Sequence, residues 1–468
     1  MFFWFSIMTM APQTNGFAQS YFPDLDLGDV RRNCRFAQVI DRFAVAAGDS
    51  LPAIFPDAKS YEGCLRLFHS DQATHENILG AHQVAVLDAI ERLRTPVRLL
   101  HDATVLDFSG HTTLEPAIGP VGNGGGRGWI AHQTIAVDPD TRLVHGLVSQ
   151  IMHVRPDKVP GETTADKRAR ESRESRLWIR GLDEIGPVPA GGDWIDVMDR
   201  GADMFELLQT RQDRRRQFLV RSTHNRALGA GSSEEKSEQK LHDLLRSRPA
   251  TARWDLDIPA KTGVKPRTAR MSGVALRTTR RVPRVKKGMY RPEPVTRNAR
   301  RIWEESPPPG REALEWVILT NRSADTPAEI EQLARWYACR MQIEEYHKVQ
   351  KSGAVVEGCQ VQCADAMTAL IAVLSVMSVM MMNLRLAARD PGQASRPATR
   401  MIPETWVRIL ERMSPAPRPV RTVRDFLIGL ACLGGYKHHP GTHPPGWSTL
   451  WKGWLRLQII ILYELSSP

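Results

Sequence analysis

The chain has 468 residues, enough for about three domains, and 42% of them are hydrophobic, enough for a buried core. Its six cysteines are too few and too scattered for a disulfide scaffold, which excludes the small disulfide-rich secreted class and favours a reducing, intracellular setting. The net charge of +11 favours a polyanionic partner without naming one.

The two most apolar segments do not predict membrane insertion. The start, MFFWFSIMTM, has no Lys or Arg to lead a signal peptide, so we expect no export signal; a start codon set upstream of the true one is the alternative. Residues 1–23 are therefore treated as an extension without an assigned fold. The run Met367–Met382 has 16 residues, short of the roughly 20 that span a bilayer, and predicts a buried core helix.

Residues 24–75 predict a small helical domain. LGDVRRNCRFAQVIDRFAVAAG has apolar residues at helical spacing and ends on Gly48, and DAKSYEGCLRLFHSD predicts a second helix with Asp57 as its N-cap. A local basic face of this domain could bind DNA through Arg31, Arg32 and Arg35. The pattern fits a small helical packing module equally well.

The next segment predicts a mixed α/β domain. An exposed, charged helix is expected at 164–182 and another at 200–212, while Thr326 and Pro327 are typical of a helix start. This alternation of strands and helices indicates one mixed sheet, followed after residue 386 by a linker and a helical tail. The expected strands are 97–104, 128–137, 142–154, 193–199, 216–224 and 314–320, with the second and third joined by a turn at Asp138-Pro139-Asp140.

Positive charge is concentrated in residues 261–301. This block has fourteen Lys or Arg and one acid, Glu293, a surplus of thirteen that exceeds the +11 of the whole chain. One basic block in an otherwise nearly neutral protein indicates a nucleic-acid surface, although a solvated loop is the alternative. Apolar residues between the charges favour strand; these are Val274, Leu276, Val282 and Val285.

Three carboxylates from three separate elements could bind metal ions. Asp102 and Asp199 each end an apolar strand, and Glu344 lies on an expected helix. Carboxylates suit Mg²⁺, which takes its other ligands from water and phosphate, and two such ions can catalyse phosphoryl transfer. Strand-end turns and a surface salt-bridge ladder would explain the same residues. The pattern also does not exclude the competing acids Asp107, Asp193, Asp196 and Asp203.

One expected helix has an unusual polar stripe. Within about 80° of one another on one face lie a phenol, a guanidinium, a carboxylate and two ammonium groups, from Tyr337, Arg340, Glu344, Lys348 and Lys351. The spacing Tyr337-x2-Arg340-x3-Glu344-x6-Lys351 resembles the Tyr-Arg-Glu-Lys signature of bacterial cut-and-paste transposases of insertion-sequence family four.

Other segments, in the same order along the chain, are also similar to this family. LGDVRRNCR resembles its N-terminal motif, LHDATVLDF its first-aspartate strand, and VMDRGADMFEL the segment with its second aspartate. FLVRSTH and WVILTN are similar to later strands, and LGGY and GWSTLWKGW to its C-terminal ending. His101 and Ala103 depart mildly from the usual first-aspartate motif. The resemblance extends from about Leu27 to Trp454.

The resemblance implies a ribonuclease-H-like catalytic sheet in which Asp102, Asp199 and Glu344 form a DDE triad and bind Mg²⁺, with Mn²⁺ as a substitute. It implies that Tyr337, Arg340, Lys348 and Lys351 hold phosphates of double-stranded DNA, with Arg221 as a further candidate. Trp316 would stack on a flipped base, although a core tryptophan that begins a strand is the alternative.

The implied activity is DNA cleavage at the inverted repeats of a transposon, a hairpin intermediate, and strand transfer into target DNA. The implied assembly is a homodimer in a synaptic complex in the bacterial cytoplasm, associated with the nucleoid and not with membranes. A catalytically inactive DNA-binding inhibitor of transposition and a host nuclease of the same fold are the alternatives. The expected domains are 24–75 (DNA-binding), 76–386 (catalytic, with a β-rich insertion at about 226–315) and 387–468 (helical, dimerisation).

Overall fold

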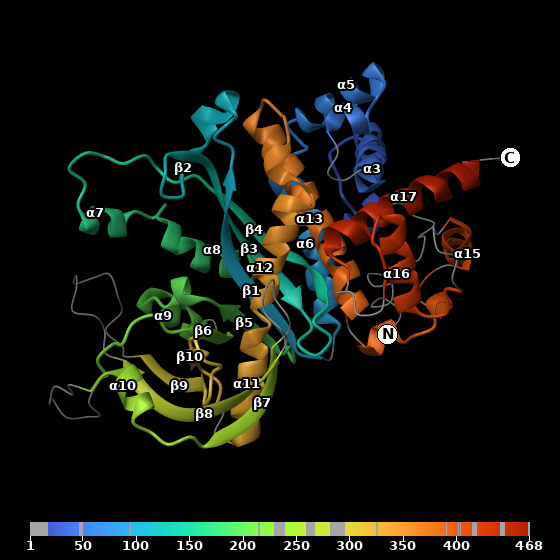
Figure 1. Ribbon diagram of the computed structural model, residues 1–468. Coiled ribbons are helices and arrows are strands. Elements are labelled where there is room, and N and C mark those ends of the chain that lie inside the picture. The colour runs from blue at the N-terminus through green and yellow to red at the C-terminus, as the bar shows by residue number, and fades with distance from the viewer. Residues whose placement is uncertain are drawn as a thin grey trace. The chain divides into compact units, whose positions relative to one another are not determined.

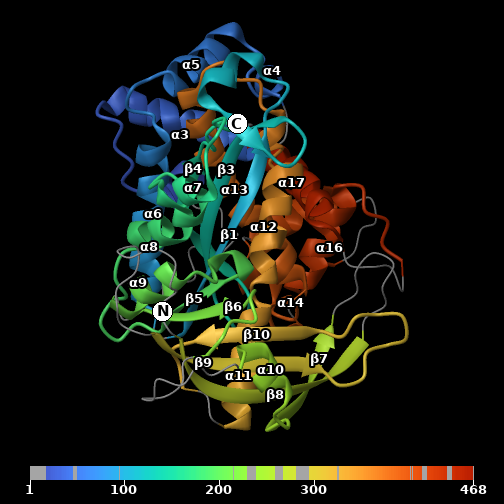
Figure 2. The same ribbon diagram turned by 90° about the vertical axis from the view of Figure 1, so that its left-hand side faces the viewer.

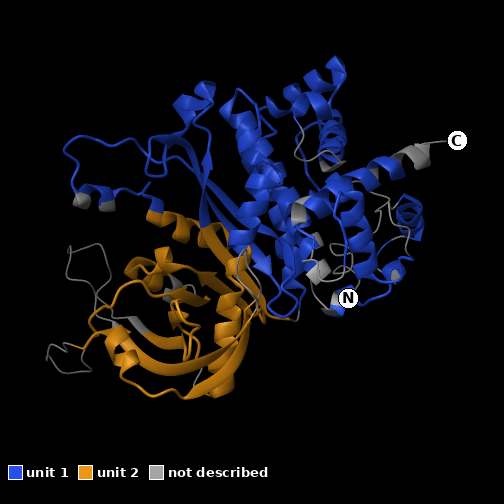
Figure 3. Cartoon of the chain, in the orientation of Figure 1, with its two compact units in different colours: residues 1–93, 103–174, 343–468 blue, residues 94–102, 175–342 orange. Residues whose placement is uncertain are grey.

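The computed structural model shows an α/β protein whose chain divides into two compact units (Figures 1 and 3). Unit 1 contains residues 1–93, 103–174 and 343–468, and unit 2 contains residues 94–102 and 175–342. The structure describes residues 17–45, 50–93, 95–213, 216–228, 239–258, 267–280, 295–323, 326–389, 391–400, 402, 404–413, 419–439 and 445–466.

Ten strands form one mixed sheet in the order β2-β3-β1-β5-β6-β10-β9-β8-β7, with β4 paired to β3. Strands β1, β5 and β6 run parallel, and β10 pairs antiparallel with both β6 and β9. The strands are β1 (Val97–Asp107), β2 (Gly119–Val121), β3 (Gly126–Val137), β4 (Val144–His153), β5 (Trp194–Met198), β6 (Gln217–Arg221), β7 (Ala252–Ile258), β8 (Arg267–Arg280), β9 (Val295–Glu304) and β10 (Glu315–Thr320). All six predicted strands are present, and β1 continues three residues beyond its predicted end at residue 104.

Unit 1 begins with the predicted N-terminal helices. Asp57 caps α5 by accepting a hydrogen bond from the Ser60 amide at 2.8 Å, which confirms the predicted N-cap. Helix α6, which the sequence did not predict, packs on β4 so closely that a Cβ on Gly146 would lie 2.3 Å from Val86. The helices are α2 (Phe17–Tyr21), α3 (Val30–Val45), α4 (Leu51–Ile54), α5 (Ala58–Phe68) and α6 (His75–Glu91).

The C-terminal part of unit 1 is helical, as expected. The predicted linker after residue 386 is wrong in part, because α13 continues to Arg389 and a short helix follows. Within the described residues α13 is the one helix long and apolar enough to cross a membrane, yet 82% of its apolar window is buried in protein. These helices are α12 (Met341–Ser352, which belongs to unit 1 from Ile343), α13 (Ala364–Arg389), α14 (Pro391–Ala394), α15 (Glu404–Met413), α16 (Val423–Leu433) and α17 (Trp447–Ser466). Unit 1 also contains α7 (Thr164–Ala169), earlier in the chain.

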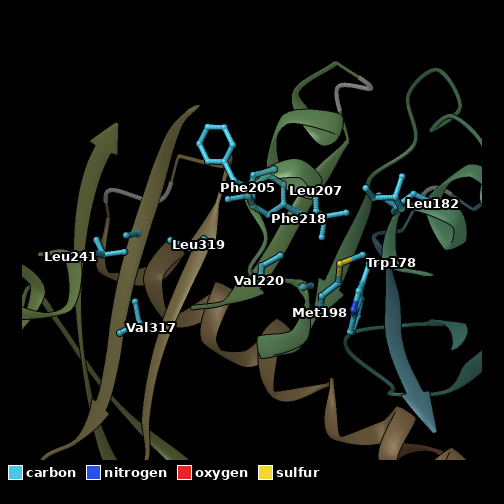
Figure 4. Close-up of a cluster of buried hydrophobic side chains, with 14 of the residues drawn as sticks. Trp178, Leu182, Met198, Phe205, Leu207, Phe218, Val220, Leu241, Val317 and Leu319 are labelled. Atoms are coloured by element: carbon cyan, nitrogen blue, oxygen red, sulfur yellow. The ribbon is translucent and has the colours of Figure 1, made fainter. Parts of the chain in front are cut away.

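Unit 2 has one hydrophobic core that joins the central strands to the predicted insertion. Phe218 and Val220 of β6 belong to the same buried cluster as Leu241 and Leu245 of α10, with Val274 of β8 (Figure 4). Figure 2 shows β10, β9 and β8 side by side, and α11 packs on β7 and β8. The insertion is therefore a continuation of the sheet. The helices are α8 (Leu177–Ile185), α9 (Phe205–Asp213), α10 (Leu241–Arg246) and α11 (Pro327–Ala338).

Two sequence expectations in this region are wrong in part. The exposed helix at 164–182 is two helices, α7 and α8, and α8 is largely buried because its apolar residues Leu177, Trp178 and Leu182 face the unit 2 core. The basic block is not one basic surface, because Arg297 and Arg300 are buried. Lys261, Lys265, Arg281, Val282, Arg284, Val285, Lys286, Lys287 and Arg291 lie outside the described residues.

Candidate functional site

Asp102 and Asp199 both belong to unit 2 and lie near the paired segments of β1 and β5. The parallel register ends with Leu100 of β1 opposite Val197 of β5. Asp102 follows Leu100 by two residues and lies inside β1, which continues to Asp107, so the predicted strand end at Asp102 is wrong. Asp199 directly follows β5 and caps the next turn. That the two carboxylates meet in one site stays a prediction.

Arg340 contacts this acidic pair directly. Its Nη1 atom lies 3.3 Å from Oδ2 of Asp102, and both side chains are largely shielded from solvent. Asp199 is half-buried and accepts a hydrogen bond from the Gly201 amide at 2.7 Å, which begins a short 3₁₀ turn, η3 (Arg200–Ala202). Both acids are thus held by groups of unit 2 and partly open to solvent.

Tyr337 and Arg221 complete a polar cluster around the two acids. Burial raises the pKa of the Tyr337 hydroxyl; the positive charges of Arg340 and Arg221 oppose this rise, and the negative charge of Asp199 adds to it. Burial also lowers the pKa of Arg221, and repulsion from Arg200 and Arg340 lowers it further. Guanidinium groups crowded in this way are a favourable site for a phosphate.

Trp316 lies beside this cluster on β10. Its ring makes an edge contact with Tyr337 at 5.4 Å between centroids, and the residue is half-buried. This position does not decide between base stacking and a core tryptophan, so the stacking role of Trp316 stays a prediction.

The polar stripe is not on one continuous helix. Helix α11 ends at Ala338 and α12 begins at Met341. Three hydrogen bonds between residues three apart mark this break; they are donated by the amides of Cys339, Arg340 and Gln342. The angular spacing that was expected of one helix therefore does not hold across the break.

The break also separates the predicted residues between the two units. Tyr337 and Arg340 belong to unit 2, whereas Glu344, Lys348 and Lys351 belong to unit 1. On α12, Glu344 is half-buried and Lys348 is exposed. Lys351 forms a 3.4 Å ion pair with Glu357. The convergence of Glu344 with Asp102 and Asp199 stays a prediction.

The competing acids have other structural partners. Asp196 is buried and binds His101 and Arg216, and Asp203 is buried and binds Ser222 and Thr223. Asp193 pairs with Arg322, and hydrogen bonds from Ser109 lower the pKa of Asp107. Satisfied carboxylates are poor candidates for metal ligands, which favours Asp102 and Asp199.

The donor chemistry fits a divalent cation in part. Two half-buried carboxylates on neighbouring strands suit Mg²⁺ or Mn²⁺, and a third carboxylate would complete a binding set. Within the described ranges, no three His, Cys, Asp or Glu side chains are grouped so that they could hold a metal ion. The role of Glu344 as a third ligand therefore remains a prediction.

The three arginines proposed for the N-terminal domain differ in exposure. Arg31 is exposed, with 95% of its side chain accessible, although it lies near Asp29. Arg32 is half-buried and donates to the Leu27 carbonyl, and the guanidinium of Arg35, also half-buried, packs against Gly63. Only Arg31 of the three presents most of its side chain to a partner.

Two residues of this site were not proposed from the sequence. Arg200 directly follows Asp199, is exposed, and acts electrostatically on Arg221. Its position next to a candidate acid is the signal that could have identified it. Asp203 was considered only as a competing metal ligand, and its hydrogen bonds to the segment after β6 are visible only in three dimensions.

Comparison with known families gives one finding. Residues 14–73 match a family model described as transposase DNA-binding. This match supports a DNA-binding transposase. It covers nearly all of the helical domain predicted at 24–75, so it favours DNA binding over a packing module for this segment. The matched segment contains Arg31, Arg32 and Arg35, and none of the residues of the acidic cluster.

Proposed function

We propose that the protein is a DDE transposase that cleaves the ends of a DNA element, forms a hairpin and transfers the freed strand into target DNA. The observation that carries this proposal is the cluster of Tyr337, Arg340 and Arg221, in which Arg340 contacts Asp102 and Asp199 acts electrostatically on Tyr337. The match of residues 14–73 to a transposase DNA-binding family supports DNA as the substrate. The mixed sheet with parallel β1, β5 and β6 supports a ribonuclease-H-like core.

The first step is hydrolysis at the end of the element. The oxygen of a water molecule bonds to phosphorus and the bond from phosphorus to the 3′ oxygen breaks. The 3′ oxygen takes up a proton to become a free 3′-OH, and the phosphate stays on the 5′ end of the flanking DNA. The 3′-OH then attacks the opposite strand to give a hairpin, a second water reopens it, and the regenerated 3′-OH attacks a target phosphorus. Each attack by a 3′-OH breaks one phosphate ester and forms another, and each attack by water breaks one ester to give a 3′-OH and a 5′-phosphate.

The cluster residues have distinct parts in these steps. Arg340 and Arg221 bind non-bridging phosphate oxygens, and the Tyr337 hydroxyl orients them, while Trp316 stacks on an unpaired base near the hairpin. Lys348 and Lys351 contact neighbouring phosphates. Asp102, Asp199 and Glu344 would hold Mg²⁺ or Mn²⁺, which supplies Lewis-acid activation and neutralises charge when bound. The proposed assembly is a homodimer that holds two transposon ends, in the bacterial cytoplasm with the nucleoid.

The decisive experiment uses purified protein, its element's terminal DNA and Mg²⁺, with nicks and hairpins resolved on denaturing gels. We expect Asp199→Ala to abolish nicking and leave end binding nearly intact. Asp193→Asn is the matched control, because this acid precedes the same strand and pairs with Arg322 instead. Binding without cleavage by the unaltered protein would favour an inhibitor, and cleavage of unrelated DNA without hairpins would favour a nuclease.

A further inference from the structure

The buried acid Asp203 lies four residues after Asp199 and connects two loops of unit 2. The Asp203 carboxylate has no solvent exposure. Its Oδ2 atom accepts hydrogen bonds from the Thr223 amide at 2.9 Å and the Ser222 hydroxyl at 3.2 Å. Asp203 follows β5, and Ser222 and Thr223 follow β6. The carboxylate therefore ties together the segments that extend from two neighbouring parallel strands.

Each of these segments carries a residue of the candidate site. Asp199 lies at the start of the first segment, and Arg221 is the last residue of β6. Another hydrogen bond joins the same two segments, because the Thr223 hydroxyl donates to the Arg200 carbonyl at 2.9 Å. The Asp203 amide closes the turn by donating to the same carbonyl at 3.1 Å. Because Arg200 and Asp203 are both held by these hydrogen bonds, few backbone torsions between Asp199 and Asp203 are left free to rotate.

The network extends into the predicted insertion. Arg226 places a guanidinium 3.4 Å from Asp203 and donates to its backbone carbonyl at 2.6 Å. His242 at the start of α10 has its Nε2 atom 3.1 Å from the Ser222 hydroxyl. Because that hydroxyl donates its hydrogen to Asp203, its oxygen accepts from His242, which requires the proton on Nε2. This orientation excludes a nucleophilic serine, whose histidine must accept the hydroxyl proton.

We propose that Asp203 is a positioning residue that sets the separation between Asp199 and Arg221. His242, in the insertion, supports this separation through its contact with Ser222. The inference rests on the proposed function, because the separation matters only if a scissile phosphate lies between the Asp199 carboxylate and the Arg221 guanidinium. Asp203 itself is buried and does not contact substrate. Removing its charge releases the two segments from each other, because this carboxylate on the first segment accepts hydrogen bonds from Ser222 and Thr223 on the second.

The test compares Asp203→Asn with Glu304→Gln. Glu304 is another acid of unit 2 with no exposed side chain, held by Arg267 on the insertion strands, so the two substitutions remove comparable buried charges. Amide hydrogen exchange is measured first. We expect Asp203→Asn to speed exchange at residues 199–203 and 222–226 together, and Glu304→Gln to leave both segments unchanged. Unchanged exchange at 199–203 in Asp203→Asn overturns the proposal.

Nicking gives a second measurement at equal end binding. We expect Asp203→Asn to slow single-turnover nicking by about 10-fold to 100-fold, the effect of losing a residue that supports a site, and Glu304→Gln to change it little. Ser222→Ala should show a smaller loss, because the Thr223 amide still binds Asp203. Equal nicking loss in Glu304→Gln assigns the effect to general destabilisation and overturns the proposal. If the unaltered protein does not nick, the proposed function fails, while the exchange comparison still decides the positioning role.

Discussion

Strands β5 and β1 each contain an Asp–Arg pair, and the two pairs differ in burial. Asp196 of β5 makes two 2.9 Å bonds to Arg216 and one to His101, with 1% exposure for both members of the ion pair. On the neighbouring strand β1, Asp102 makes a 3.3 Å contact with Arg340, and their side chains are 17% and 12% exposed. The Asp196 group is shielded from solvent, whereas the Asp102 group is partly open to it.

This contrast shows how one residue type serves two purposes on neighbouring strands. A buried acid needs every lone pair satisfied, so its partners are permanent and its contribution is to the fold. A half-buried acid keeps access to solvent and ligands. The predictions that follow test this difference, from the largest expected effect to the smallest.

Asp196→Ala should cause the largest loss of stability. It leaves Arg216 buried without its carboxylate, and breaking a buried pair costs about 3–5 kcal/mol. Urea unfolding measures the free energy of unfolding directly. Asp199→Ala is the comparison, and it should unfold at nearly the same urea concentration as the unaltered protein. Equal stability of the two variants would contradict the structural role of Asp196.

Asp102→Asn should affect activity and leave stability nearly unchanged. Loss of one acid misplaces the reacting groups, so we expect nicking to fall by about 100-fold or more. End binding should become tighter, because a negative charge is removed beside Arg340 and close to the DNA phosphates. Gel-shift titrations measure this binding at fixed salt. Weaker binding would mean that Asp102 organises Arg340 for DNA.

Arg31→Ala should weaken end binding through charge alone. The exposed Arg31 side chain can release a counterion from DNA, so its loss should reduce the slope of log affinity against log salt by about one. Arg32→Ala is the internal comparison, because Arg32 binds the Leu27 carbonyl and should lower the stability of the N-terminal helices instead. An unchanged salt slope for Arg31→Ala would place this residue outside the DNA contact.

The smallest effect concerns Glu315, whose backbone carbonyl holds Arg221 at 3.1 Å. Hydrogen bonds from Arg246, and then from Arg301, lower the pKa of Glu315 below its ordinary value of 4.5. Its ion pairs therefore stabilise the folded protein fully above that value, and this contribution is lost as pH falls through the lowered pKa. Glu315→Gln should remove this part of the acid sensitivity, less than about 1 kcal/mol for a partly exposed group. Urea unfolding at neutral pH and at pH values below 4.5 provides the measurement.

The sequence predicted the local features of this protein well. Strands β1, β5, β6 and β10 follow from short apolar runs, and the start of α11 follows from Thr326 and Pro327, which form a capping box with Glu329 and a proline at the first helical positions. Asp199, directly after β5, follows from the same strand assignments, whereas Asp102 lies inside β1 and not at its predicted end. These features depend on residues close together in the chain, so periodicity and capping reveal them.

Pairing between distant segments was decided only by tertiary structure. Nothing in the local pattern distinguishes Asp196 from Asp199, because the difference lies in Arg216 and His101, which arrive from other strands. The burial of Arg297 and Arg300 could not be predicted for the same reason, because a count of charges along the chain does not show which residues pack around them. The turn between α11 and α12 likewise interrupts a segment whose spacing fits one helix. The sequence by itself determined the strands, the helix caps and the candidate acids, and the packing of the sheet decided which of these acids are satisfied internally and which remain partly open to solvent.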